Sequence, residues 1–269
     1  MRCRLNIFYG EEGKCMFALE RQNRILELLA TDGAVWVSKL AVELNVTEET
    51  VRRDLEKLEK QESLRRTHGG AVPIDGTTYE LSLEKRKHTN VEEKAQLAKI
   101  AAGYVVTGDT VFLDASTTTF YMAKELKSMS NITVITNSIR VIEELQGSDG
   151  IKVIAVGGIV SRNESFVGTM AEKCIEDNYF ASKMFFSSKG VTASAGILES
   201  NEQECGIKKK MMKNAGSKYY ICDKSKLGRV GFVKLSDFSD IDYFITGTLD
   251  DETLRSRLTD SETHLVTSR

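Results

Sequence analysis

The sequence predicts an α/β protein with an N-terminal winged helix-turn-helix domain and a larger α/β domain after it. Two observations in the first quarter predict the winged helix: three helical patterns follow one another closely, and a short basic hairpin comes after the third. The third observation is that short apolar strand candidates alternate with amphipathic helices from Gly108 onward, which indicates a largely parallel sheet. The expected division is an extension at 1–17, the winged helix at 18–73, a linker at 74–90 and the α/β domain at 91–269.

Composition places the chain among ordinary globular proteins. It has 269 residues, of which 41% are hydrophobic and 28% charged. No apolar run approaches the ~20 residues that span a bilayer, and the first residues lack a secretory signal. The five cysteines are scattered without a Cys-x-x-Cys pair, so neither disulfides nor a metal site is indicated. We expect a cytoplasmic chain without cofactor or membrane partner.

The first two helices of the winged domain follow from periodicity and capping. Residues 1–15 have no clear periodicity, whereas Glu20–Thr31 shows a helical pattern that ends at a plausible C-cap, Asp32-Gly33. A short β-prone run, Ala34–Val37, follows. Ser38 is then expected to cap a second helix that ends at Asn45.

The third helix, expected over Thr47–Lys60, is the best marked. Thr47 is a suitable N-cap, because its hydroxyl can accept an otherwise unpaired amide of the first turn. Val51, Leu55 and Leu58 recur at helical spacing and form one apolar stripe to bury. The opposite face, rich in hydrogen-bond donors, is left for solvent or a ligand.

The charges on and after this helix point to nucleic acid. Arg53 and Lys57 lie four residues apart, so their repulsion would be relieved by a phosphate between them. In the hairpin, Ser63–Thr67 carries two arginines, and Gly69-Gly70 is expected to form the two-residue turn. The helix would enter a groove while the wing contacts the backbone. The candidate DNA-binding residues are Ser38, Thr47, Thr50, Arg52, Arg53, Lys57, Arg65, Arg66 and His68.

The overall charge of the chain qualifies this interpretation. The net charge is −2, so the chain is not a uniformly basic nucleic-acid binder, and only the local placement of cations supports the contact. A surface helix with solvated charges is the structural alternative. Because one domain would bind modestly, we expect paired domains in a homodimer or homotetramer.

The segment after the winged domain reads as a solvated linker. Pro73, the only proline, marks its start, and residues 74–90 are polar and charged. A helix is expected from about Val91 to Val105.

The α/β domain is predicted from six apolar strand candidates and the helices between them. Two of those helices are Thr118–Leu126 and Ile139–Leu145. Ligands of parallel sheets collect beyond the carboxyl ends of the strands. The strand candidates are Thr110–Leu113, Ile132–Thr136, Lys152–Val156, Lys183–Ser187, Tyr219–Cys222 and Tyr243–Thr246.

Small and polar residues follow four successive strands, as a phosphate site requires. Hydroxyls and amides at helix starts bind anions, and glycines let a ligand approach the backbone. Each loop alone is more often an ordinary helix cap, and the lysines could be solvated. Together they predict one shared pocket, for which the candidate effector-binding residues are Asp114, Ser116, Thr117, Thr118, Thr119, Thr136, Asn137, Ser138, Gly157, Gly158, Lys189, Lys208 and Lys226.

Several motifs resemble the DeoR family of transcriptional regulators. Arg21–Leu26, Val51–Leu55 and His68–Ala71 resemble its DNA-binding domain. Leu113–Thr119 and Asp223–Lys226, with Thr136-Asn137-Ser138, Val156-Gly157-Gly158 and the pair Glu202 and Lys208, resemble its effector domain, which is similar to the ribose-5-phosphate isomerase and CoA-transferase type of fold. The resemblance implies a sequence-specific regulator that binds a double-stranded DNA operator. It further implies a repressor of a sugar-metabolism operon whose binding is modulated by a phosphorylated sugar or related metabolite.

Two other functions stay open. One is a sugar-phosphate isomerase-like enzyme with an accessory DNA-binding domain, which the phosphate loops favour. Against it, Ser188-Lys189-Gly190 lacks the acidic residue that many family members have before the glycine, and no convincing acid/base pair stands out. The other is an interaction module that uses the winged helix for protein contacts.

Overall fold

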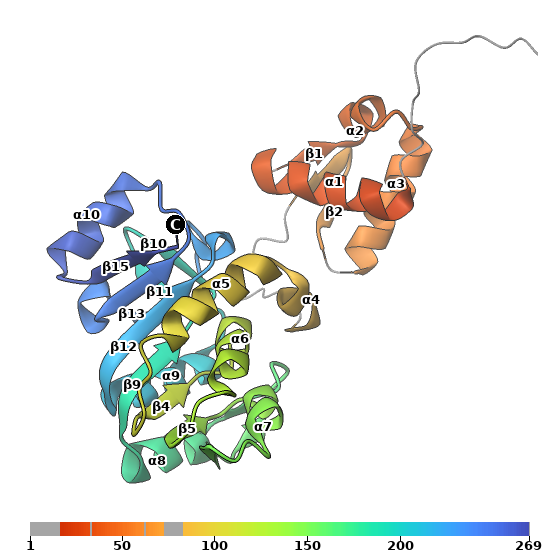
Figure 1. Ribbon diagram of the computed structural model, residues 1–269. Coiled ribbons are helices and arrows are strands. Elements are labelled where there is room, and N and C mark those ends of the chain that lie inside the picture. Colours follow the sequence, from red (N-terminus) through yellow and green to blue (C-terminus); the bar gives the residue numbers. More distant parts are fainter. Residues whose placement is uncertain (1–16, 33, 62, 73–82, 269) are drawn as a thin grey trace, which may run out of the picture. The chain divides into compact units, whose positions relative to one another are not determined.

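The structure is a computed structural model that describes residues 17–32, 34–61, 63–72 and 83–268. The chain divides into two compact units, Met1–Asp75 and Gly76–Arg269, which we call the winged unit and the effector unit. The expected extension up to residue 16, the glycine of the first C-cap and the proline at the start of the linker lie outside the described residues. Figure 1 shows the elements of each unit.

The winged unit has the predicted order of helices and strands, so a winged helix-turn-helix is confirmed. Three helices pack around a small antiparallel sheet in which β3 lies between β1 and β2. Its elements are α1 (Ala18–Asp32), β1 (Val35–Trp36), α2 (Val37–Glu43), α3 (Glu48–Lys60), β2 (Arg65–Thr67) and β3 (Gly70–Val72).

Helix α3 begins and packs as its sequence predicts. Thr47 is the N-cap, and its side chain accepts a hydrogen bond from the Thr50 amide at 3.2 Å. Val51, Leu55 and Leu58 are buried in one core with residues of α1 and α2. The apolar stripe therefore fixes which face of α3 remains exposed.

Two details of the winged unit differ from expectation. Helix α2 starts at Val37, so Trp36 occupies the N-cap position and Ser38 lies inside the helix without capping it. The hairpin turn consists of His68 and Gly69, because Gly70 already pairs with Thr67 in the ladder. Neither glycine has a left-handed φ. Gly70 is required for space instead, because a Cβ there would lie 1.8 Å from the Val35 carbonyl oxygen.

The expectation of a solvated linker is wrong for its last part. Residues Leu83–His88 form α4, in which Leu83 and Arg86 are buried. These side chains find partners in the effector unit that the local sequence does not reveal. Helix α5 follows at Val91–Ala102 and ends three residues before the expected Val105.

The effector unit is built on a seven-stranded parallel sheet with the order β15-β14-β12-β9-β4-β5-β6. The parallel sheet is confirmed. Its strands are β4 (Thr110–Leu113), β5 (Ile132–Thr136), β6 (Ile151–Ala155), β9 (Ala181–Phe186), β12 (Ala215–Cys222), β14 (Tyr243–Thr246) and β15 (His264–Thr267).

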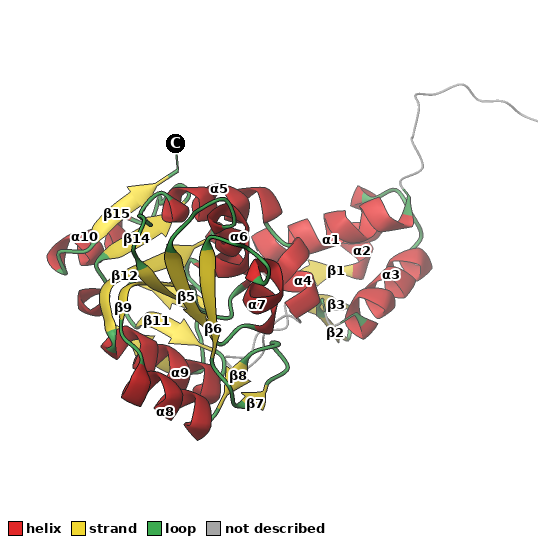
Figure 2. Cartoon of the chain, turned by 60° about the horizontal axis from the view of Figure 1, so that its bottom comes forward, coloured by secondary structure: helices red, strands yellow, loops and turns green. Residues whose placement is uncertain are grey.

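Helices cover both faces of this sheet, as Figure 2 shows. Helices α5, α6 (Thr117–Leu126) and α7 (Ile139–Leu145) contribute to the core on one face. Helices α8 (Thr169–Asn178), α9 (Glu202–Lys213) and α10 (Glu252–Asp260) contribute to the core on the other. The sheet is therefore the middle of three layers.

Smaller elements complete the unit beside these layers. A three-stranded antiparallel sheet contains β10 (Gly190–Thr192), β11 (Gly196–Glu199) and β13 (Val233–Ser236). Strands β7 (Ile159–Val160) and β8 (Phe166–Val167) form a hairpin, and two 3-10 helices span Lys224–Lys226 and Phe238–Asp240. None of these strands, nor β15, is among the strand candidates of the sequence.

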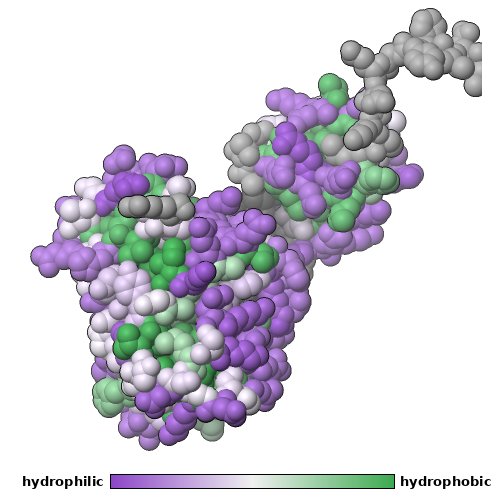
Figure 3. Space-filling model, in the orientation of Figure 1, coloured by the Kyte–Doolittle hydropathy of each residue, from purple (hydrophilic) through white to green (hydrophobic). Residues whose placement is uncertain are grey.

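The exposed face of the effector unit in Figure 3 is mixed in character. Hydrophilic residues cover the part where α6 lies, and hydrophobic residues gather in a patch beside it. Among the described residues, no helix combines the length and apolar character needed to cross a membrane.

Candidate functional sites

A polar groove lies between α3 and the wing of the winged unit. Four of the nine candidate DNA-binding residues line it: Ser38 from the first turn of α2, Arg52 from α3, and Arg66 and His68 from the wing. Glu48, Thr67 and Gly69 also line it. The structure thus brings together cations from segments that are separate in the sequence.

The arginines of α3 are held by glutamates one turn earlier. Arg52 Nη2 lies 2.6 Å from Glu48 Oε2, and Arg53 Nε lies 3.2 Å from Glu49 Oε1. All four side chains are exposed, and pairs of this kind contribute only about 0.3 to 0.5 kcal/mol. Both arginines can therefore exchange a glutamate for a backbone phosphate at little loss.

The other candidate residues lie around this groove. Thr47 and Thr50 are in the first turn of α3, where their hydroxyls bond each other at 2.9 Å. Arg53, Lys57 and Arg65 are exposed but do not line the groove.

Three residues of the family motifs in the winged unit, Arg21, Gln22 and Asp54, are structural instead. Arg21 Nε donates to Asp54 Oδ2 at 2.5 Å, and Gln22 Nε2 donates to Asp54 Oδ1 at 3.1 Å. All three residues are buried. They fasten α1 to α3 and so hold the exposed face of α3 in position.

The second site lies in the effector unit at the point where the chain reverses direction across the sheet. Strands β4, β5 and β6 proceed to one side, whereas β9 pairs with the other edge of β4. A pocket opens beyond the carboxyl ends of β4 and β9, where open α/β sheets bind ligands. Ser116, Thr117 and Thr118 line it from one strand end, and Ser187 and Ser188 from the other.

The start of α6 forms one wall of this pocket. Ser116 caps the helix, and its Oγ accepts from the Thr119 amide at 3.2 Å. Thr119 Oγ1 donates to Asp114 Oδ1 at 2.8 Å, so Thr119 supports the loop and does not line the pocket. The remaining first amides of a helix have no intrahelical partner and favour an anion.

Lys208 is buried in an ion-pair network. Its Nζ lies 2.9 Å from Asp114 Oδ2 and 2.5 Å from Glu199 Oε1, and donates to the Ser187 carbonyl oxygen at 2.7 Å. Burial alone would lower the pKa of this ammonium, but the two carboxylates outweigh burial and raise it. Three acceptors use the three N–H donors, so Lys208 organises the pocket wall and has no donor left for an effector.

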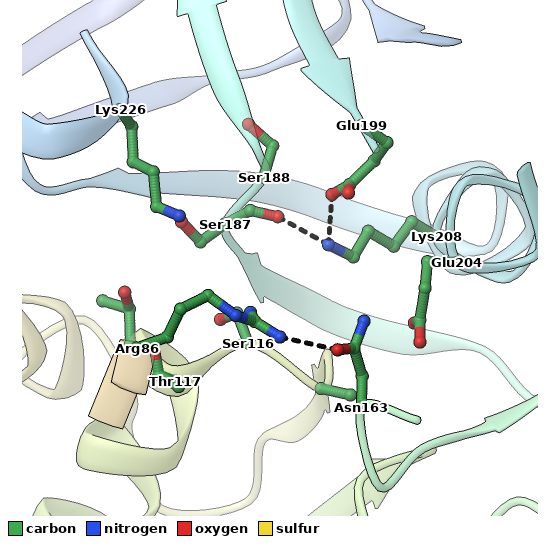
Figure 4. Close-up of a pocket in the computed structure, with 12 residues that line it drawn as sticks. Arg86, Ser116, Thr117, Asn163, Ser187, Ser188, Glu199, Glu204, Lys208 and Lys226 are labelled. Atoms are coloured by element: carbon green, nitrogen blue, oxygen red, sulfur yellow. Dashed lines mark hydrogen bonds and ion pairs between the residues drawn. The ribbon is translucent and has the colours of Figure 1, made fainter. Parts of the chain in front are cut away.

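Two other cations line the pocket, as Figure 4 shows. Arg86 comes from α4, and its Nη2 donates to Asn163 Oδ1 at 2.7 Å. Lys226 comes from the 3-10 helix after β12. Ser187 Oγ is buried at the same wall without a hydrogen-bond partner among the described residues. This hydroxyl is therefore free to bond a water molecule or a polar ligand.

Carboxylates line the opposite side of the pocket in Figure 4. Glu199 belongs to the Lys208 network, whereas Glu204 Oε1 accepts from Ser165 Oγ at 2.5 Å and Ser161 Oγ at 3.0 Å. The Ser188-Lys189-Gly190 loop itself carries no acidic residue. The pocket carboxylates come instead from β11 and α9, which are distant from that loop in sequence.

The remaining candidate residues lie outside the pocket. Ser138 caps α7, Thr136 Oγ1 accepts from the Ser138 amide, and Asn137 Nδ2 donates to the Phe166 carbonyl. They follow β5, and Gly157 and Gly158 follow β6, on strands that lead away from the β4/β9 junction. Lys189 is buried but does not line the pocket.

Six polar residues that line the pocket are absent from the predicted set. Ser187 and Ser188 follow β9, and Arg86 lies in the segment expected to be a solvated linker. Asn163, Glu199 and Glu204 do not lie in the strand-end loops from which the prediction was made. Of the predicted set, Ser116, Thr117, Thr118, Lys208 and Lys226 do line it. No group of His, Cys, Asp or Glu among the described residues could hold a metal ion.

The two units together define a class of protein: a winged-helix reader of DNA joined to a ligand-binding α/β sensor. Family models agree with each unit, since residues 21–77 match the DeoR-like helix-turn-helix domain and residues 89–248 match the DeoR C-terminal sensor domain. The chain belongs to the DeoR family of transcriptional regulators.

Individual relatives support this assignment. The chain is 42% identical to the transcriptional regulator YulB of Bacillus subtilis strain 168 over 86% of its own length and 89% of the relative. It is 35% identical to the lactose phosphotransferase system repressor of Streptococcus mutans, over 88% and 94% respectively. Among solved structures, ribose-5-phosphate isomerase A of Methanocaldococcus jannaschii aligns with a TM-score of 0.40 and 17% identity, covering 52% of this chain and 55% of the isomerase.

Proposed function

We propose that this protein represses a sugar-metabolism operon and that a phosphorylated sugar or related metabolite controls its affinity for the operator. Residues 18–73 of the winged unit bind double-stranded DNA, and residues 91–269 of the effector unit, together with α4, bind the metabolite. The repressor of the lactose phosphotransferase system among its relatives supports the sugar assignment. A homodimer or homotetramer would present two winged units to two half-sites.

The DNA-binding role rests on the groove between α3 and the wing. Arg52, Arg66 and His68 converge there, and Arg53 and Lys57 extend the basic surface along α3. A recognition helix in the major groove reads bases, while the wing and flanking cations contact phosphates. In a plot of log affinity against log salt concentration the slope is negative, and each lost phosphate contact reduces its magnitude by about one.

The observation that supports the effector assignment is that cationic side chains and a helix start line one side of the pocket, and carboxylates line the other. Arg86, Lys226 and the start of α6 are suited to a phosphate. Glu199 and Glu204 on the opposite side are suited to accept hydrogen bonds from sugar hydroxyls. A phosphorylated sugar satisfies both sides, and its phosphate can also pair with the Ser187 hydroxyl.

Substitutions in each site test the two roles separately. Arg52→Ala with Arg53→Ala should weaken binding to the DNA upstream of the protein's own gene at least tenfold in fluorescence anisotropy. Lys60→Ala, at the far end of the same helix, is the control. Unchanged affinity in the double variant would contradict the DNA-binding role and favour a module for protein contacts.

Lys226→Ala should abolish the thermal stabilisation that a matching pentose or hexose phosphate gives to the full chain. The exposed Lys224 on the same 3-10 helix supplies the control, Lys224→Ala. A Lys226 variant that is stabilised as strongly as wild type would refute the placement of the phosphate.

The pocket glutamates are also the kind of residue that an acid/base catalyst needs, so a second candidate function is an isomerase-like enzyme with an accessory DNA-binding domain. Glu199 is held by Lys208 and Glu204 by two serine hydroxyls, which suits them to recognition more than to proton transfer. Turnover of a panel of pentose and hexose phosphates decides between the two. Isomer formation that Glu204→Gln abolishes would establish the enzyme.

A further inference from the structure

Helix α4 links the pocket of the effector unit to the chain that leads to the winged unit. It is the first described element after residue 72, and residues 73–82 join it to the wing. Lys94 Nζ donates to the Arg86 and Thr89 carbonyl oxygens at 2.6 and 2.8 Å, and Tyr121 Oη donates to the Lys87 carbonyl oxygen at 3.0 Å. The carboxyl end of α4 is thus held by α5 and α6.

Two side-chain contacts fasten α4 to the loop of residues 161–165, which we call the pocket loop. The first is the hydrogen bond from Arg86 Nη2 to Asn163 Oδ1 at 2.7 Å. The second runs through Arg140, which lies 2.6 Å from Glu84 of α4 and 2.6 Å from Glu164 of the loop. The pocket loop and α4 are therefore connected at two points, one through Arg86 and one through Glu84.

The pocket loop is itself fixed to the pocket by a carboxylate. Glu204 Oε1 accepts from Ser161 Oγ and Ser165 Oγ, one at each end of the loop. Ser161 Oγ also accepts from the Asn163 amide at 3.0 Å, which positions the side chain that meets Arg86. A continuous set of polar contacts therefore runs from Glu204 through the loop to α4.

Arg86 is the member of this set that a phosphate would reach. It lines the pocket with Ser116, Thr117 and Lys226, and Figure 4 shows its guanidinium between the start of α6 and Asn163. A doubly charged phosphate is a stronger acceptor for guanidinium than a neutral amide oxygen. A phosphate that draws the guanidinium toward the start of α6 would therefore weaken its hydrogen bond to Asn163.

From this geometry we propose that Arg86 is an anion-binding residue and that its transfer from Asn163 to the bound phosphate removes one of the two contacts between α4 and the pocket loop, which leaves only the Arg140 bridge of these two and loosens α4. This loosening is the step that signals occupancy to the winged unit through the covalent connection. The inference rests on the proposed function, because it requires a phosphorylated ligand. It assigns the coupling to three positioning residues, Asn163, Glu84 and Arg140.

The proposal predicts opposite effects on ligand affinity and on coupling. If Asn163 holds α4 in the ligand-free arrangement, Asn163→Ala shifts the free protein toward the loosened arrangement. Ligand affinity should then rise about threefold or more, while the ligand-induced change in DNA affinity should shrink by a similar factor. Asn163→Asp places a charged acceptor against Arg86, so it should weaken ligand binding. Damage to the loop alone would lower ligand affinity in both variants.

The experiment uses the full chain with two measurements on each variant. Calorimetry gives the affinity for the tightest binder in a panel of pentose and hexose phosphates, with inorganic phosphate included. Anisotropy gives the affinity for upstream DNA with and without that binder. Glu84→Gln should act like Asn163→Ala, and Asn178→Ala, an exposed asparagine on α8, is the control.

The outcomes separate this inference from the proposed function. Tighter binding and reduced coupling in Asn163→Ala, with weaker binding in Asn163→Asp, would support the transfer of Arg86. Wild-type coupling in Asn163→Ala and Glu84→Gln, or equal ligand affinity in the alanine and aspartate variants, would overturn it while leaving the pocket in place. A wild-type chain that binds no member of the panel would refute the proposed effector as well.

Discussion

The buried carboxylate of Asp54 gives the sharpest prediction for the winged unit. Asp54 on α3 is 2% exposed and accepts from both Arg21 and Gln22 of α1. Asp54→Ala leaves the buried Arg21 guanidinium without this carboxylate and the Gln22 amide without its acceptor. Removing one partner of a buried pair costs about 3 to 5 kcal/mol.

This loss is as large as the whole stability expected of the unit. Domains below roughly 70 residues rarely derive more than about 3 to 5 kcal/mol from a single core. Asp54→Ala should therefore unfold most of the winged unit at room temperature, while the effector unit, which has its own cores, stays folded. DNA binding should be lost, although no contact residue has changed.

Hydrogen exchange read by mass spectrometry is the suitable assay, because it reports each unit separately. Peptides from α1 and α3 should exchange rapidly in Asp54→Ala, and peptides from the parallel sheet should remain protected. Glu56→Ala is the control on the same helix, since it removes only the exposed pair with Lys60 at 2.8 Å. Protection in α3 equal to that of the control would refute the structural role of Asp54.

Further substitutions test the rest of the structure. Lys208→Met leaves two buried carboxylates without their cation, and the effector unit should lose roughly 3 to 5 kcal/mol in urea denaturation; a loss below 1 kcal/mol would contradict the buried network. Gly70→Ala should disrupt the sheet of the wing and abolish DNA binding in a gel shift, because its Cβ would lie 1.8 Å from the Val35 carbonyl oxygen, whereas Gly69→Ala, with nothing within 4 Å, should leave that sheet as protected from hydrogen exchange as in wild type. Burial lowers the pKa of the Lys94 ammonium to about 8 from 10.5, against the opposing charge of Asp223. Between pH 8 and pH 10.5 Lys94 is therefore protonated in the unfolded chain but neutral in the folded unit, so the free energy of unfolding should rise with pH over this range in wild type relative to Lys94→Met. Equal pH dependence in the two proteins would contradict a buried Lys94.

Local sequence patterns were sufficient for the elements whose burial follows from their own residues. The continuous apolar runs Thr110–Leu113, Ile132–Thr136 and Tyr243–Thr246 gave the bounds of β4, β5 and β14 without error. The hydroxyl of Thr47 and the apolar stripe of α3 likewise gave its start and its buried face. These features depend on contacts within one segment.

Features that depend on distant partners were not predictable in this way. Helix α4 reads as a solvated linker because its charged residues meet Arg140 and Asn163 only in the folded chain. Strand β15, His264–Thr267, pairs with β14 although its sequence is too short and mixed to stand out.

The candidate pocket shows the same limit. The loops after β4 and β5 each place a serine at the N-cap of the next helix, yet only the first loop lies at the junction with β9. The order of the strands in the sheet decides which loop meets a ligand, and the sequence of a single loop does not reveal that order. Lys208 was identified as a cation of the site, but its two carboxylate partners, Asp114 and Glu199, turn it into a structural residue.

The measurement that tests the central claim most directly is a DNA-binding titration of the full chain at several salt concentrations, with and without phosphorylated sugars. We predict specific binding to the DNA upstream of the protein's own gene, an affinity that falls steeply as salt rises, and a change of about 5- to 150-fold on addition of one sugar phosphate. Specific binding that no pentose or hexose phosphate alters would contradict control by such a metabolite. No salt-dependent binding under any of these conditions would contradict the account as a whole.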